Sequence, residues 1–300
     1  MRVNQAPTGV LLCATPEPLV SFVLQGKTTP LICRPWWPAW EAPLSRRMRV
    51  LVGLGVAVLG CGVYIWLFGV QTALALEARY VARKMPVVWD LPAELPDSSV
   101  SRSPGKKLSY FGYEFEVSWD DIDEAKSRTI GERKAIIAFR SGNVLSVWSG
   151  PPREFVNSVL SMGMDREAFR QMYGDEALQS DYALNRLMLT TTPDKITPFI
   201  SKRSAASQSM LIVMKGISAP RGADSGIFAV NADGFRGFQY GHPPDSRWFS
   251  VELFADNGSL DFIFAQNADG PTVISQKDIN RILQTLHKAD ANTVARSLSK

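Results

Sequence analysis

The longest uninterrupted apolar stretch of the chain runs from Val50 to Val70 and contains no charged side chain. At about 1.5 Å of rise per residue, a helix of this length reaches roughly 31 Å, which matches the ~30 Å hydrocarbon thickness of a bilayer. Its glycines, among them Gly53 and Gly60, weaken a helix in water but are tolerated in lipid. The pattern predicts a transmembrane helix with basic flanks over residues 46–84, and the lipid bilayer is its expected partner.

Three other interpretations of this stretch have a weaker physical basis. A buried helix of a soluble protein usually carries a polar residue every third or fourth position, and here none appears. The apolar core of a cleaved signal peptide is shorter. The run Val58-Leu59-Gly60-Cys61 loosely resembles a lipoprotein box, so lipidation at Cys61 is an alternative, but apolar sequence continues well beyond that cysteine.

Small residues recur at every fourth position of the apolar stretch, at Gly53, Ala57 and Cys61. Such residues lie on one ridge of a helix and allow a second helix to approach closely. A homodimer or a partner helix packed on this ridge is therefore a hypothesis. Because glycine is frequent in membrane helices, the ridge also forms without a partner.

Basic residues flank the apolar run equally: Arg46, Arg47 and Arg49 precede it, and Arg79, Arg83 and Lys84 follow it. The preceding three directly adjoin the run, and positive residues next to a span favour the cytoplasmic side. We therefore expect the N-terminus inside and the C-terminal domain outside the cytoplasm.

The segments around the helix have polar or proline-rich patterns without a lasting period. Residues 1–45 are rich in proline and contain Trp36, Trp37 and Trp40, which predicts a disordered leader. Alternatively the native start is Met48, because Met48-Arg49 followed by an apolar run resembles the beginning of a bacterial signal-anchor. Residues 85–107 predict a proline- and serine-rich tether, and residues 291–300 a polar tail.

Residues 108–290 show the patterns of a single α+β domain. Apolar and polar residues alternate at positions 113–118, as in a strand with one wet face. Turn sequences at 141–143, 231–234 and 256–259 separate pairs of strands and predict hairpins. The first strand of the last pair has three apolar residues on one face, and so has the second: Phe249, Val251 and Leu253, then Leu260, Phe262 and Phe264.

Helical patterns fill residues 153–200 and follow Ser275, whereas the apolar run Met210 to Ile217 predicts a central strand. Together these patterns predict a transmembrane helix followed by one domain, in which an antiparallel sheet built from hairpins is packed by helices.

The charge distribution argues against a nucleic-acid partner. The chain has 33 Lys and Arg against 29 Asp and Glu, a net charge of +4. Nine of the basic and three of the acidic residues precede residue 85, which leaves 24 against 26 in the remainder. A nucleic-acid binder concentrates positive charge on its folded surface, and this domain is near neutral.

The cysteines are Cys13, Cys33 and Cys61, all before the predicted domain. The domain therefore has no disulfide, thiolate metal site or cysteine nucleophile. No cofactor is predicted, since no glycine-rich phosphate loop or His-x-x-x-His pair occurs in the sequence.

Two places carry candidate chemistry. His242 and Asp245 share a proline-stiffened loop, 241–247, and make a membrane-tethered hydrolase the alternative function. Asp120, Asp121 and Asp123 are candidate calcium ligands, although the run lacks the glycine of an EF-hand loop. A helix that begins at Ser118, with these acids in its first turn, is the simpler explanation.

The main prediction is a non-enzymatic, single-pass membrane protein. Its exposed α+β domain serves binding, scaffolding or complex assembly near the membrane.

Overall fold

The computed structural model describes residues 46–95, 99–100, 105–243 and 246–289, so the predicted leader and polar tail lie outside the described residues. The chain divides into two units, Met1–Leu54 and Gly55–Lys300. The described part of the first unit is helical.

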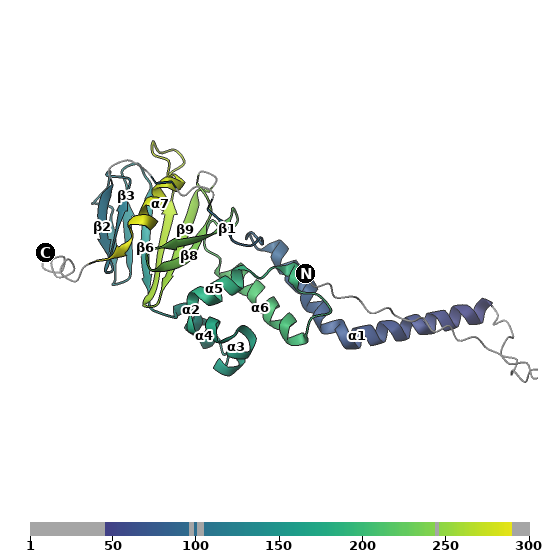
Figure 1. Cartoon of the computed structure of the whole chain (residues 1–300). Helices are drawn as coiled ribbons and strands as arrows, with labels where there is room; N and C mark the ends of the chain where they lie inside the picture. Colours follow the sequence, from purple (N-terminus) through teal and green to yellow (C-terminus); the bar gives the residue numbers. More distant parts are fainter. Residues whose placement is uncertain (1–45, 96–98, 101–104, 244–245, 290–300) are drawn as a thin grey trace, which may run out of the picture. The chain divides into compact units, whose positions relative to one another are not determined.

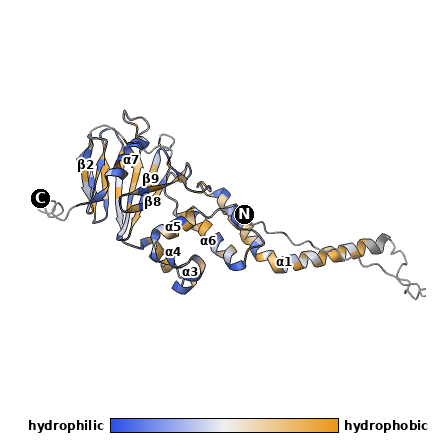
Figure 2. Cartoon of the chain, viewed as in Figure 1, coloured by the Kyte–Doolittle hydropathy of each residue, from blue (hydrophilic) through white to orange (hydrophobic). Residues whose placement is uncertain are grey.

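The first helix, α1 (Arg46–Lys84), is long and apolar enough to span a membrane (Figure 1). No part of its most apolar window is buried within the protein, and along this part of the helix Figure 2 shows orange alternating with white. The helix continues past the apolar run for roughly 20 Å, from Val70 to Lys84. Gly53, Ala57 and Cys61 are all exposed along it.

The last part of α1 is a component of the folded domain. Ala75 and Ala78 are buried in a small cluster with Ile196, Ala205 and Ile212, of which the last two belong to α6 (Lys202–Ser218). Small side chains on α1 let the two helices approach closely. The domain therefore holds the helix by packing and not by a flexible link alone.

The domain is built on a mixed sheet of eight described strands, in the order β1-β7-β8-β9-β10-β6-β5-β4. Their bounds are β1 (Ala93–Glu94), β4 (Arg128–Ile130), β5 (Lys134–Ala138), β6 (Val144–Gly150), β7 (Ile227–Ala232), β8 (Phe235–Tyr240), β9 (Trp248–Ala255) and β10 (Gly258–Ala265). Neighbouring strands pair antiparallel, except that β1 runs parallel to β7. The predicted antiparallel sheet is thus mixed, because part of the segment predicted as a tether returns to the sheet edge.

One face of this sheet is covered by a second, three-stranded sheet and by the last helix. The strands β2 (Lys106–Tyr110), β3 (Tyr113–Val117) and β11 (His287–Lys288) pair in the order β11-β3-β2, and α7 (Gln276–Thr285) packs with them. The six apolar residues predicted to share a face of β9 and β10 are all buried in this cluster. The period-2 pattern predicted this half of the core because apolar residues occupy every second position of β9 and β10, on the face toward this cluster.

The other face of the sheet is packed by helices. These are α2 (Glu154–Ser161), α3 (Arg166–Tyr173), α4 (Asp175–Gln179), α5 (Asp181–Leu189), a 3₁₀ turn η1 (Pro193–Lys195) and α6. Phe238 and Tyr240 of β8 point into this layer and are buried among Leu184, Leu211 and Met214. Sheet residues of alternating direction therefore serve two separate cores.

The run Met210 to Ile217 lies in α6, so the predicted central strand is wrong. Ser201 caps this helix by accepting the backbone N–H of Ser204 at 3.0 Å. The apolar run is continuous because α6 is buried on two sides: Ile212 packs toward α1, and Leu211 and Met214 toward the sheet. A helix with two dry sides shows no clear period.

Candidate functional site

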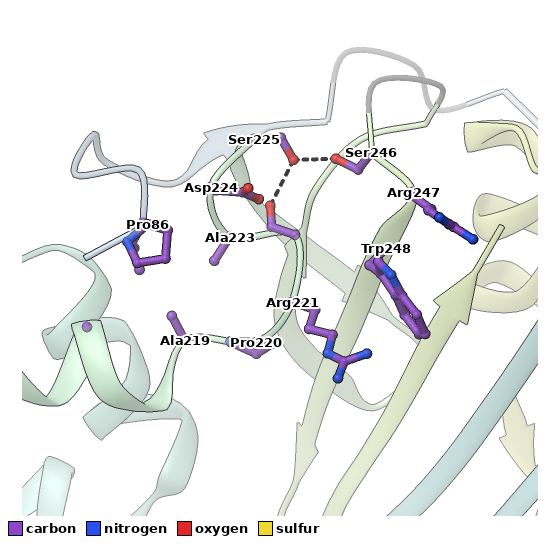
Figure 3. A pocket seen from close by; sticks show the side chains of 13 residues that line it. Pro86, Ala219, Pro220, Arg221, Ala223, Asp224, Ser225, Ser246, Arg247 and Trp248 are labelled. Carbon is purple, nitrogen blue, oxygen red and sulfur yellow. Dashed lines mark hydrogen bonds between the residues drawn. The ribbon is translucent and has the colours of Figure 1, made fainter. Parts of the chain in front are cut away.

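A cavity of about 480 Å³ lies where the chain leaves α1 and meets the sheet (Figure 3). Pro86 and Val87 line it from the segment after α1, residues 219–225 from the α6–β7 loop, and Ser246, Arg247 and Trp248 from the start of β9. Three segments that are distant in sequence thus form one concave surface.

The α6–β7 loop is held in a fixed shape by its backbone. Gly222 has φ +95°, and a Cβ there would lie 2.6 Å from the Trp248 carbonyl oxygen, so only glycine fits without strain. The N–H of Ala223 donates to the Pro220 carbonyl at 3.2 Å, and the N–H of Val88 donates to the Ala223 carbonyl at 2.8 Å. The second bond attaches the segment after α1 to the loop.

Two arginines and one aspartate are among the residues that line the cavity: Arg221, Arg247 and Asp224. The Arg221 guanidinium lies 4.5 Å from the centre of the Trp248 ring. This cation–π contact positions the arginine without neutralising its charge. The hydroxyls of Ser225 and Ser246 are hydrogen-bonded to each other at one edge of the cavity (Figure 3). The surface offers N–H and O–H donors with a net positive charge, which suits an anion.

The residues predicted from the 241–247 loop are only partly gathered at this cavity. Ser246 and Arg247 line it, whereas the His242 ring lies against Phe228, 5.9 Å between ring centres, and is not part of the lining. Asp245 lies outside the described residues. A catalytic role of His242 with Asp245 stays a prediction.

The predicted helix start at Ser118 is wrong, because residues 119–127 form an irregular segment, with a turn at 124–126, that bonds to β5 and to the β5–β6 turn. Ile122 pairs with Phe139 as an isolated bridge, which holds this segment extended. The Asp121 carboxylate accepts the backbone N–H of Ser141 at 2.8 Å, and Asp123 pairs with Lys126 at 3.1 Å. The hydrogen bond from Lys126 is the main reason that the pKa of Asp123 is lowered.

Two of the candidate calcium ligands, Asp121 and Asp123, are thus engaged in local bonds, and Asp120 is exposed. Among the described residues no group of three or more His, Cys, Asp or Glu side chains is placed to hold a metal ion.

A second cavity, of about 220 Å³, collects carboxylates that the sequence analysis did not single out. Glu154 of α2, Asp181 of α5, Glu252 of β9 and Asp261 of β10 line it. Asp181 has a structural role, because its carboxylate accepts the backbone N–H groups of Phe155 at 3.3 Å and Val156 at 2.9 Å at the start of α2.

Glu252 and Asp261 are directly opposite each other on neighbouring strands. Burial raises the pKa of Glu252 to about 7, although the Tyr240 hydroxyl donates to it at 3.0 Å. Burial and the charges of Glu252 and Glu154 raise the pKa of Asp261 well above its usual range. Such a pair holds a proton near neutral pH, as acid–base catalysis requires.

The register of the two strands is the signal that could have revealed this pair. Two acidic residues directly opposite each other destabilise an antiparallel pair of strands, so such a placement is unusual. In the sequence both residues simply occupy polar positions of strands with one wet face.

Comparisons with protein-family models, with curated proteins and with solved structures show no match to this chain.

Proposed function

We propose that this protein is a single-pass membrane-anchored binding protein whose α+β domain holds an anionic ligand beside the membrane. The observation that carries the proposal is the pair Arg221 and Arg247 at one cavity. Among the described residues neither guanidinium forms an ion pair with a protein carboxylate. A small molecule with a phosphate or carboxylate group would supply the missing counter-charge.

The position of the cavity supports a role close to the lipid surface. Its lining begins at Pro86, two residues after the end of α1, and a Cβ added to Gly216 of α6 would meet the Met85 side chain at 2.7 Å. The segment after α1 is thus packed on the domain at the cavity. With α1 continuing roughly 20 Å past the apolar run, the ligand would be held about that far from the hydrocarbon.

Titration calorimetry of the full chain in detergent, with inorganic phosphate and with acetate as probes, tests the proposal. We expect saturable binding of at least one probe, weakened at least about tenfold in each of Arg221→Gln and Arg247→Gln, since a charged hydrogen bond contributes about 1.5–3 kcal/mol. Arg128→Gln, an exposed arginine on β4, is the matched control and should bind as wild type. Equal binding by all variants would contradict the arginine cavity as the ligand site.

A membrane-tethered hydrolase is the second candidate function, and the cavity with Glu252 and Asp261 favours it. Because the pKa of each carboxyl group is raised, the pair can share one proton: the protonated member can donate it to a leaving group, and the ionised member can accept a proton from water. In this version of the hypothesis the two acids, and not His242, would carry the proton transfers.

Full-length protein assayed with chromogenic esters, phosphates and glycosides tests this second function. We expect turnover that falls at least about a hundredfold in Glu252→Gln, in the range that general acid–base groups contribute. The exposed Glu124→Gln is the control and should keep the wild-type rate. If wild type and Glu252→Gln have the same rate on every substrate class, the acid pair is not catalytic.

A further inference from the structure

Phe199 is an apolar side chain in an unusual place. It lies between η1 and α6, and 79% of its surface is exposed, the largest fraction among the large hydrophobic residues in the described part of the chain. Its neighbours Ile196 and Ile200 turn inward to the cluster around Ala75 and Ala78. The loop therefore has two apolar sides. The inner side packs on α1, and the outer side, which is Phe199, is mostly exposed.

The one ring that Phe199 meets among the described aromatic contacts belongs to α1. The rings of Phe199 and Phe68 are 5.6 Å apart, centre to centre, and cross edge-on at 68°. Close by, the Gln71 side-chain amide donates to the Ile200 carbonyl at 3.5 Å. These contacts fix the position of the loop along the axis of α1.

This position lies within the apolar run, because Phe68 comes two residues before Val70, the last residue of the run. If residues 50–70 occupy the hydrocarbon, a side chain packed on Phe68 lies at its edge. Water at that level would be replaced by acyl chains and headgroups.

We propose that the loop 197–200 dips into the bilayer, so that Phe199 inserts among the lipid chains beside α1. This inference rests on the membrane anchoring of the proposed function. Its occupant is lipid, since the exposed ring continues the lipid-facing surface of α1. Aromatic side chains are favoured at this depth, and burying one removes apolar area from water.

Charges next to the loop fit the same placement. Lys202 and Arg203 follow it in the first turn of α6, and both are exposed. Arg203 donates to the Gln171 side chain at 2.6 Å. With the loop in the bilayer, the exposed Lys202 would lie at the level of the phosphate headgroups. The domain would then touch the bilayer at two points, along α1 and at Phe199, which restricts its tilt.

An environment-sensitive label at position 199 tests the inference. In the full chain, with Cys13, Cys33 and Cys61 replaced by serine, Phe199→Cys is labelled with NBD and reconstituted in vesicles of phosphatidylcholine and phosphatidylglycerol. Met162→Cys is the matched control, because Met162 is about equally exposed, at 77%, and lies at the end of α2, outside the cluster that packs on α1.

We expect blue-shifted emission at position 199, quenching by doxyl-labelled lipids and at least about twofold weaker quenching by iodide than at position 162, because the label would lie at the acyl boundary. Iodide quenching equal to that at 162 would overturn the insertion. Protection from both quenchers would also overturn it, since a partner helix and not lipid would then cover the loop.

Flotation separates this inference from the anchoring on which it rests. If the labelled chain floats with vesicles and position 199 stays aqueous, the loop contact alone is wrong. If the chain does not float after alkaline extraction, the anchoring itself is wrong. Circular dichroism matching the unlabelled parent shows that the Phe199→Cys chain is folded.

Discussion

Lys215 is a fully buried lysine on α6, and its environment explains its altered acidity. Its ammonium donates to the Leu189 carbonyl at 3.1 Å and lies 5.1 Å from the centre of the Trp89 ring. Loss of solvation is the main reason that its pKa falls to about 8; the charge of Asp90 partly opposes the shift, and the charge of Lys195 adds to it. No sequence pattern distinguishes this lysine from an exposed one.

Lys215→Met tests this burial through the pH dependence of stability. Below pH 8 Lys215 is charged in both the folded and the unfolded state, and burying this charge destabilises the folded state. Between pH 8 and about 10.5 the folded state loses the proton first, so wild-type stability relative to the variant should rise with pH, by up to about 3 kcal/mol. Thermal unfolding of the full chain in detergent, with Lys202→Met as exposed control, measures this. A stability difference between wild type and Lys215→Met that does not change with pH would contradict the lowered pKa of Lys215.

At the scale of single elements, the periodic patterns were informative where one face is dry. Strands β9 and β10 follow the predicted alternation because Phe249, Val251 and Leu253 enter one core while Ser250 and Glu252 face the helical side. The apolar residues of α6 lie on two sides, so this helix shows no clear period. At residues 118–124 the bond from Ser141 to the Asp121 carboxylate holds the chain in a non-helical shape despite local helix signals.

The candidate sites show the same division between local and distant information. The sequence offered His242 and Asp245 of the 241–247 loop as catalytic candidates, and that role stays a prediction; two other residues of the loop, Ser246 and Arg247, line the cavity. Arg221 could not be associated with Arg247 in advance, since they come from different loops. Glu252 and Asp261 meet only because the turn between β9 and β10 sets their register.

At the scale of the whole chain, the orientation of the domain decides which ligands it can meet. We expect it outside the cytoplasm, since Arg46, Arg47 and Arg49 adjoin the apolar run directly. Intact cells that express single-cysteine chains, treated with a membrane-impermeant maleimide, test this. Met162→Cys in the cysteine-free chain should react in intact cells, and a chain that keeps only Cys13 should react only after lysis. The reverse labelling would show the opposite orientation.

The sequence by itself determined the apolar helix, its length and the α+β character of the domain after it, because these depend on composition and short periods along the chain. The tertiary structure alone decided that β1 returns to the sheet, that α6 is a helix packed on α1, and that Arg221, Arg247 and Trp248 surround one cavity. It also decided the contact of Phe199 with Phe68. Such juxtapositions join residues far apart in sequence, so their energy comes from packing and charge that no local pattern records.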